Sequence, residues 1–227
     1  MPASQHKAPL PKKLPRGRHP LTQAAVAGSQ RVRLLDAVAH VVTDKGYGAS
    51  TVADVIALAG VSRRTFYELF PGLEDCFLAA YEDGMRGLFG AIRAALAGVA
   101  RDDPALRSRI AIDAYLAALA SAPAAAWAFT VEVLGAGRRA LDRRDWVMAQ
   151  WAERWRVFHR LRRQSEPGLA DVSDAQLLAL VGGIEELVRD QLRRHGAPSL
   201  PQIGDALNTF AASVLATRPS SVAVRRR

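Results

Sequence analysis

Hydrogen-bond donors of several kinds are concentrated in one short stretch of the first third of the chain. Ser62, Arg63, Arg64, Thr65 and Tyr67 supply hydroxyl and guanidinium groups. A guanidinium group can donate to both acceptors on the edge of a guanine or to a phosphate oxygen. Hydroxyl groups can donate to phosphates or meet the methyl group of thymine. These residue types therefore suit recognition of double-stranded DNA, provided that one face of a helix presents them.

Two short helices joined by a tight turn would present these donors. The stretch 51–54, Thr-Val-Ala-Asp, predicts a capping box that opens the first helix. Gly60 can adopt the left-handed conformation that the turn needs. Ser62 is a favourable N-cap for a second helix over 63–69, which Pro71-Gly72 would end.

A longer amphipathic helix is predicted ahead of this pair, over about residues 30–45, because its apolar residues recur at three- and four-residue spacing. Gly46 and Gly48 would end it. Such an arrangement is the helix-turn-helix pattern, in which the second helix of the pair enters the major groove. The spacing alone fits an ordinary helical hairpin with a solvated polar face equally well.

The residues themselves resemble the DNA-binding segment of the TetR family of repressors, over about residues 34–81. The likeness rests on the Ala-Gly-Val-Ser turn at 59–62, the Thr-Phe-Tyr triplet at 65–67, Phe70, and Glu-Asp-Cys-Phe-Leu-Ala-Ala at 74–80. Outside this segment the chain agrees with the family in length, helicity and pattern. The resemblance implies an all-α fold with an N-terminal three-helix DNA-binding domain and a C-terminal helical domain for ligand binding and dimerisation.

The same resemblance assigns roles to individual side chains. It implies that Thr65 and Tyr67 touch the DNA backbone and that Arg63 and Arg64 lie nearest to the bases. The predicted DNA-binding set is Ser50, Thr51, Ser62, Arg63, Arg64, Thr65 and Tyr67, with Ser50 and Thr51 at a phosphate. Leu73 is a departure, because the family often has a phosphate-contacting lysine at that position.

Charge and composition divide the chain into four regions. Residues 1–28 are predicted to be a basic, disordered arm, 29–75 the helix-turn-helix domain, 76–216 the ligand-binding and dimerisation domain, and 217–227 a flexible basic tail. The net charge is +9, and residues 1–35 contain basic residues but no acidic ones: Lys7, Lys12, Lys13, Arg16, Arg18, Arg31 and Arg33. A basic balance suits a polyanionic partner, although a genome rich in arginine codons would also produce it.

Two late helices supply the candidate dimer interface. Ser-Asp-Ala-Gln at 173–176 predicts a capping box that opens a helix to about His195, and a last helix centres on Phe210. Adjacent glycines inside the first of these weaken it, so they indicate close approach of a neighbouring helix. The predicted interface is Leu180, Gly182, Gly183, Ile184, Leu187 and Phe210. The alternative is that both apolar faces are buried inside the monomer.

All four tryptophans lie between residues 127 and 155. Because ligand pockets have large apolar walls with a few polar groups, this region is the candidate pocket. The predicted lining is Trp127, Phe129, Trp146, Trp151 and Trp155. Ordinary core packing is the alternative for each of them.

No catalytic grouping accompanies these features. The histidines are isolated, no Gly-rich phosphate loop is present, and Cys76, the only cysteine, follows two acidic residues that would not activate its thiol. We expect no cofactor and no metal. The uncharged stretch 114–131 is predicted to be two buried helical segments that meet at Pro123 rather than a membrane span.

These observations predict a cytoplasmic, non-enzymatic transcriptional regulator. It would bind a palindromic operator as a homodimer, respond to a small-molecule effector and act as a repressor, as the family resemblance favours. Its partners would be double-stranded DNA, a second copy of itself and the effector, with no membrane. The competing classes are a small helical enzyme and a basic protein of the membrane surface.

Overall fold

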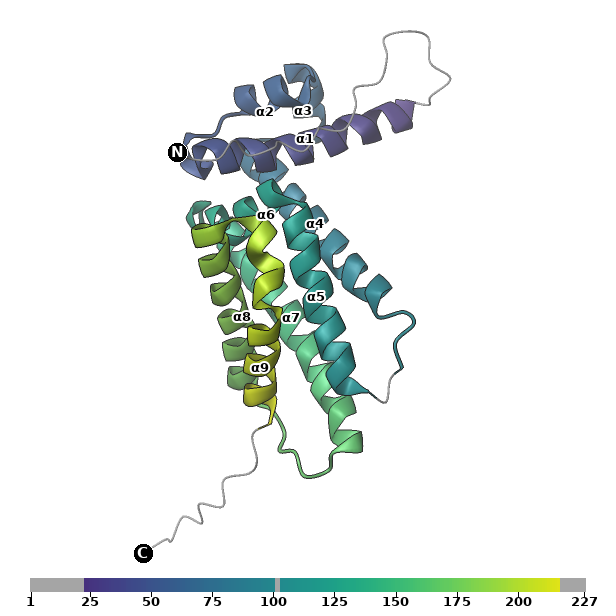
Figure 1. Cartoon of the computed structure of the whole chain (residues 1–227). Coiled ribbons are helices and arrows are strands. Elements are labelled where there is room, and N and C mark those ends of the chain that lie inside the picture. Colours follow the sequence, from purple (N-terminus) through teal and green to yellow (C-terminus); the bar gives the residue numbers. More distant parts are fainter. Residues whose placement is uncertain (1–22, 101–102, 217–227) are drawn as a thin grey trace, which may run out of the picture.

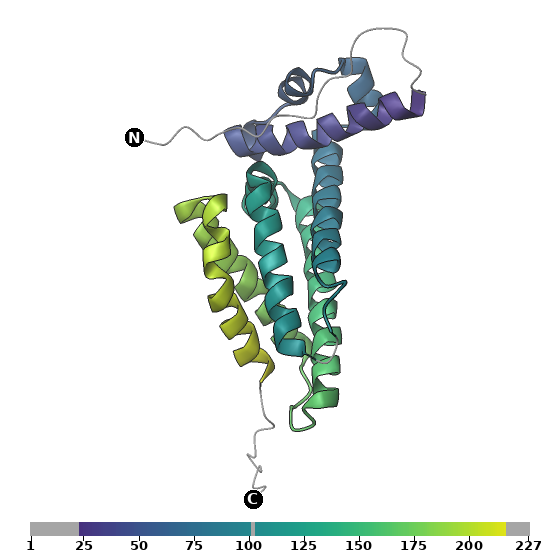
Figure 2. The same ribbon diagram turned by 45° about the vertical axis from the view of Figure 1, so that its right-hand side comes forward.

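The computed structural model describes residues 23–100 and 103–216, and these ranges contain helices and no strand (Figure 1). The α-helices are α1 (Gln23–Lys45), α2 (Val52–Ala59), α3 (Arg63–Leu69), α4 (Leu73–Ala95), α5 (Pro104–Ser121), α6 (Pro123–Thr130), α7 (Arg138–Ser165), α8 (Asp174–His195) and α9 (Gly204–Leu215). Short 3-10 helices are η1 (Tyr47–Ala49), η2 (Glu132–Gly135) and η3 (Ala197–Ile203). The predicted all-α class is confirmed. In both ribbon views α1–α3 lie across one end of the bundle that α4–α9 form (Figures 1 and 2).

Local sequence signals set the helix-turn-helix as predicted. The Thr51 hydroxyl accepts from the Asp54 amide at 3.2 Å, and the Asp54 carboxylate accepts from the Thr51 amide at 3.1 Å. Gly60 has a φ of 61°, in the left-handed region that a side chain would strain. The Ser62 hydroxyl accepts from the Thr65 amide at 3.0 Å and so caps α3.

The first helix begins earlier than the sequence pattern predicted. It starts at Gln23 instead of about residue 30, so residues 23–28 of the predicted arm are helical. The reason is composition: these residues include alanines and a glutamine, which favour helix, and the single Gly28 costs only about 1 kcal/mol. The remainder of the predicted arm, residues 1–22, and the predicted tail, 217–227, lie outside the described residues.

Arg33 does not belong with the basic residues that are free to meet DNA. Its side chain is buried, and one guanidinium nitrogen donates to the carbonyl of Ala59 at 2.7 Å. That carbonyl lies at the C-terminal end of α2, where the last carbonyls have no partner in the helix and the helix dipole favours a cation. Arg33 therefore fastens α1 to the turn of the helix-turn-helix.

Two hydrophobic cores share α4. The first lies beneath the helix-turn-helix and contains Leu34, Phe66, Phe77 and Tyr81, together with Phe129 from α6. The second fills the bundle and includes Leu88 of α4 with apolar residues of α5, α8 and α9. The predicted domain boundary between residues 75 and 76 falls within the first turn of α4, so this helix belongs to both units.

The uncharged stretch 114–131 contains the last part of α5 and the whole of α6, and these helices meet at Pro123 as predicted. None of the described helices is by itself long and apolar enough to span a membrane, although α5 followed by Pro123–Gly135 passes that test as a pair bent by 105°.

Removing the Arg33 anchor should destabilise the folded chain. In Arg33→Met the apolar stem is kept, but the charge-assisted bond to the Ala59 carbonyl is absent. We expect the free energy of unfolding, measured by urea denaturation, to fall by about 1–3 kcal/mol. Arg86→Met, which removes an exposed arginine of α4, should change it by less than about 0.5 kcal/mol. Equal stability of the two variants would show that Arg33 does not anchor α2.

Candidate nucleic-acid interface and ligand pocket

The short helix α3 separates its apolar and polar residues into two faces. Phe66 and Phe70 are buried, whereas Ser62, Arg63 and Arg64 are exposed. Tyr67 is 47% exposed, an unusual position for a large aromatic side chain. The predicted donors of α3 therefore lie on an accessible surface that a rigid apolar face holds in place.

The two arginines of α3 differ in their local electrostatics. Nε of Arg64 donates to Glu68 at 2.8 Å, and this bond raises the pKa of the Arg64 guanidinium. The pair is fully solvated, so its net contribution is small and the Arg64 side chain can leave Glu68 for a stronger partner. Arg63 lies over the ring of Tyr67, 5.7 Å from its centroid. The ring of Tyr67 thus gives the Arg63 guanidinium a cation–π contact on the surface of α3.

The residues before α2 are less available for contact with DNA than those of α3. Ser50 is buried, and its hydroxyl donates to the carbonyl of Gly46 at 2.8 Å. A contact between this hydroxyl and a phosphate would require that bond to break. Thr51 is exposed, although its hydroxyl also bonds to Asp54. Leu73, which replaces the lysine common in the resembled family, packs against the first core.

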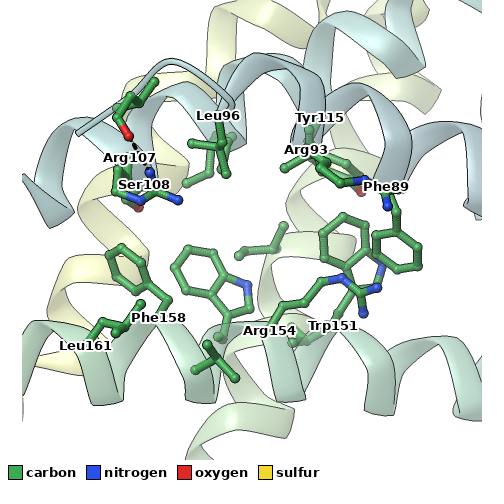
Figure 3. Close-up of a pocket in the computed structure, with 18 of the residues that line it drawn as sticks. Phe89, Arg93, Leu96, Arg107, Ser108, Tyr115, Trp151, Arg154, Phe158 and Leu161 are labelled. Atoms are coloured by element: carbon green, nitrogen blue, oxygen red, sulfur yellow. Dashed lines mark hydrogen bonds between the residues drawn. The ribbon is translucent and has the colours of Figure 1, made fainter. Parts of the chain in front are cut away.

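A cavity of about 530 Å³ lies inside the bundle, between α4, α5, α7 and α8 (Figure 3). Of the predicted pocket residues, Trp151 and Trp155 line it. The lining that the sequence did not predict includes Phe158 of α7 and residues of the three other helices: Phe89, Ile112, Tyr115, Val181 and Ile184. Trp151 makes ring contacts with Phe89 and Tyr115 at centroid distances of 4.5 and 5.4 Å.

The other three predicted pocket residues lie elsewhere. Phe129 is buried in the first core, with its ring edge-on to Phe77 and Tyr81. Nε1 of Trp127 donates to Glu132 at 3.2 Å. Trp146 is 53% exposed. Phe129 therefore packs in the core, Trp127 makes a polar contact with Glu132, and Trp146 lies on the surface.

A largely buried ion-pair group lies at the wall of the pocket. Glu185 of α8 lines the cavity and pairs with Arg144 of α7 and Arg189 of α8. Burial raises the pKa of the Glu185 carboxyl, and the two arginines counteract that effect. Arg189 also donates to the carbonyl of Thr130, the last residue of α6, at 3.2 Å. The pocket lining is thus connected by polar contacts to α6.

Two further polar contacts connect the same region to the helix-turn-helix unit. The hydroxyl of Thr43, near the end of α1, donates to the Ala124 carbonyl at 2.8 Å. The amide of Tyr47 donates to the Glu132 carboxylate at 2.9 Å.

Among the residues placed by the structure, no group of three or more His, Cys, Asp or Glu side chains could hold a metal ion.

The structure divides the predicted dimer interface. Leu180 and Ile184 are buried in the second core, because they fall on the side of α8 that fills the bundle. These two side chains are not accessible on the surface of the monomer. This agrees with the alternative prediction, in which the apolar face is buried inside the monomer. Leu187 is 43% exposed, and a side chain at Gly182 would meet open space.

The close approach of a neighbouring helix, which the glycine pair predicted, is confirmed at Gly183 and not at Gly182. A Cβ at this position would lie 2.6 Å from Cζ of Phe210, so α8 and α9 can pack this closely only because Gly183 has no side chain. That approach occurs within the monomer. The interface role of Gly182, Gly183, Leu187 and Phe210 stays a prediction.

Comparison with known proteins agrees with this arrangement. Residues 34–80 match the family model of the bacterial regulatory proteins of the tetR family. No curated protein matches the sequence. Among solved structures, the fatty acid degradation regulator FadR from Bacillus halodurans superposes with a TM-score of 0.71 at 15% identity, over 93% of this chain and 100% of that chain.

Two further structures have nearly the same similarity. FadR from Bacillus subtilis, in complex with stearoyl-CoA, has a TM-score of 0.70 at 17% identity, over 80% of this chain and 97% of its own. A TetR-family regulator from Syntrophomonas wolfei has a TM-score of 0.69 at 16% identity, over 84% of this chain and 96% of its own. Residues 34–80 therefore match the model of the tetR family, and the chain has the fold of TetR-family regulators.

Proposed function

We propose that this protein is a ligand-responsive transcriptional regulator that binds operator DNA through α3. The observation that carries the proposal is the exposed row of Arg63, Arg64 and Tyr67 on a helix held by buried Phe66, within the segment that matches the tetR family model. Such a helix has the size and donors that the major groove accepts. The action would be repression, in the cytoplasm where DNA is accessible, and we propose no catalytic role.

Replacing both arginines of α3 should weaken operator binding. Arg63→Ala/Arg64→Ala should cost about 1–3 kcal/mol for each arginine that binds a base, whereas Tyr67→Phe should weaken all sequences evenly. The measurement is fluorescence anisotropy with a DNA fragment selected from the source genome by the unaltered protein.

The control is Arg86→Ala/Arg160→Ala, which removes the same charge from exposed positions of α4 and α7. It should retain operator affinity. A double variant of α3 that binds like the control would place the recognition surface on another element.

The DNA-binding form would be a homodimer. One recognition helix reads only a few base pairs, so a second copy related by a two-fold axis is needed to specify a site, and the subunit interface sets the spacing of the half-sites. The outer surface of α8 and α9, with exposed Leu187 and the partly exposed Phe210 ring over Gly183, is the interface that we propose.

Charge at the exposed part of this surface should separate the subunits. Leu187→Arg is expected to sediment as a folded monomer and to lose operator binding. Leu106→Arg, at a leucine of α5 with 45% exposure against 43% for Leu187, should remain dimeric. Arginine at Ile184 would disrupt the monomer core instead, because that side chain is buried. A Leu187→Arg variant that remains dimeric would place the interface elsewhere.

The effector would bind in the cavity between α4, α5, α7 and α8. Its apolar lining suits a ligand with a large apolar part, and FadR from Bacillus subtilis, crystallised with stearoyl-CoA, supports a long-chain ligand by analogy. A ligand that displaces α4 or the Glu185 ion pair would act on the helix-turn-helix directly through α4, and through α6 by way of Arg189 and Thr130.

The α6 route can be tested at Glu132. In Glu132→Leu the carboxylate that accepts from the Tyr47 amide is absent, while the cavity lining is unchanged. We expect the effect of a pocket ligand on operator affinity to decrease, because one of the two routes is broken, with ligand affinity retained. Gel-shift titrations measure operator affinity, and calorimetric titrations measure ligand affinity. If the ligand changes the operator affinity of the variant as much as that of the unaltered protein, the coupling runs through α4 alone.

A further inference from the structure

The cavity has an excess of positive charge at its rim. Arg93 of α4, Arg107 of α5 and Arg154 of α7 line it, and the structure shows one carboxylate in the described lining, that of Glu185. Glu185 is already matched by Arg144 and Arg189. Glu185 therefore does not offset the charge of the other arginines in the lining, and the described rim is cationic.

The rim arginines differ from their neighbours on the same helices. Arg86 of α4 pairs with Asp83 at 2.8 Å, and Arg156 of α7 pairs with Glu153 at 2.9 Å. In contrast, within 23–100 and 103–216 no carboxylate pairs with Arg93, Arg107 or Arg154. Most described arginines of α4–α9 pair with a carboxylate, and three of those that do not line this one apolar cavity.

Arg154 is held in place without being neutralised. Its guanidinium lies 3.7 Å from the centroid of the Phe89 ring, and one of its nitrogens donates to the Gln150 carbonyl at 2.7 Å. Figure 3 shows Arg154, Phe89, Trp151 and Arg93 gathered at one end of the cavity. Burial and the nearby charge of Arg93 lower the pKa of the Arg154 guanidinium. An anion at this point would relieve both effects.

Below these arginines the wall is apolar and aromatic. Trp151 and Phe158 of α7 and Tyr115 of α5 line the cavity (Figure 3), and Trp155 and Ile112 belong to the same lining. The cavity volume of about 530 Å³ falls within the range of about 300–1,000 Å³ that small-molecule sites occupy. A cationic rim above an apolar interior fits a molecule with an anionic head and a hydrocarbon body.

We propose that the effector is an amphiphilic organic anion, with its charged head bound by Arg93 and Arg154 and its apolar body among the aromatic side chains of α7. The inference rests on the proposed function only in taking this cavity as the effector site. It adds the chemical class of the ligand and names the two side chains that select the anion.

The test uses three probes that share one hydrocarbon chain and differ in head group: dodecanoate, 1-dodecanol and dodecyltrimethylammonium, all below their micellar concentrations. Isothermal titration calorimetry of the full chain should show dodecanoate binding at least about tenfold more tightly than the alcohol, as one charge-assisted hydrogen bond allows. The cation should bind more weakly than the alcohol. The preference for dodecanoate should decrease as salt is added.

Variants assign the preference to the rim. In Arg93→Gln/Arg154→Gln the affinity for dodecanoate should fall about tenfold, to that for 1-dodecanol, while the affinity for the alcohol changes little. Arg93→Lys/Arg154→Lys retains both charges and should retain the preference. Arg86→Gln/Arg160→Gln, with the same loss of charge from α4 and α7 outside the cavity, should behave like the unaltered protein.

Several outcomes would overturn the inference. These are equal affinity for dodecanoate and 1-dodecanol, no saturable binding of dodecanoate, and an undiminished preference in the Gln double variant with native circular dichroism. Operator binding without ligand is measured separately on the same samples. If DNA binding holds and the anion preference is absent, the ligand class alone is wrong; if the unaltered protein binds no genomic fragment, the proposed function fails.

Discussion

The helix α4 packs into two hydrophobic cores along its length. Its first half contributes Phe77 and Tyr81 to the core beneath the helix-turn-helix, and its second half contributes Leu88 to the core of the bundle. Phe89, the next residue, lines the cavity and contacts Trp151. Because a packed helix moves as a rigid element, a displacement at the cavity end of α4 reaches the DNA-binding end without an intervening hinge. The position of α3 therefore depends on this shared helix.

The contact between α4 and α6 joins the bundle to the helix-turn-helix at a second place. Gly84 of α4 allows the two helices to approach, since a Cβ there would lie 2.9 Å from Cε2 of Phe129. Phe129 in turn contacts both Phe77 and Tyr81. Together with the bonds from Thr43 and Tyr47 to α6 and η2, these contacts make the junction between the two units both apolar and polar. Such a junction has a defined geometry, which a regulator needs if ligand binding is to alter the DNA-binding surface.

The sequence predicted well those features that depend on a few consecutive residues. The capping boxes at Thr51 and Ser173, the left-handed Gly60 and the N-cap at Ser62 were all confirmed, because each is a local bond or a local backbone conformation. Residues whose environment is set by distant elements were harder to place. Arg33 has the appearance of a DNA-facing charge in the sequence, but the carbonyl of Ala59, in a different helix, determines its position.

The same limit explains the pocket and the interface. Periodicity shows that Leu180 and Ile184 are apolar positions of one helix face, but it does not show whether a helix of the same chain or of a second copy covers them. A cavity is defined by the space that side chains of several helices leave unfilled. Phe89 and Tyr115 therefore carried no local signal of their role, whereas the clustered tryptophans gave a signal that was correct for Trp151 and Trp155 and misplaced for Trp146.

In the dimer that we propose, the cavity of the bundle controls the distance between the two recognition helices. Spin labels at Ala57→Cys, on the exposed face of α2, would report that distance by pulsed electron paramagnetic resonance, since the native Cys76 is buried and inaccessible to the label. The account predicts one well-defined distance between labels in the free dimer and a shifted distance when dodecanoate is bound. An absence of dipolar coupling, or a distribution that is the same with and without dodecanoate while calorimetry shows it bound, would contradict the account.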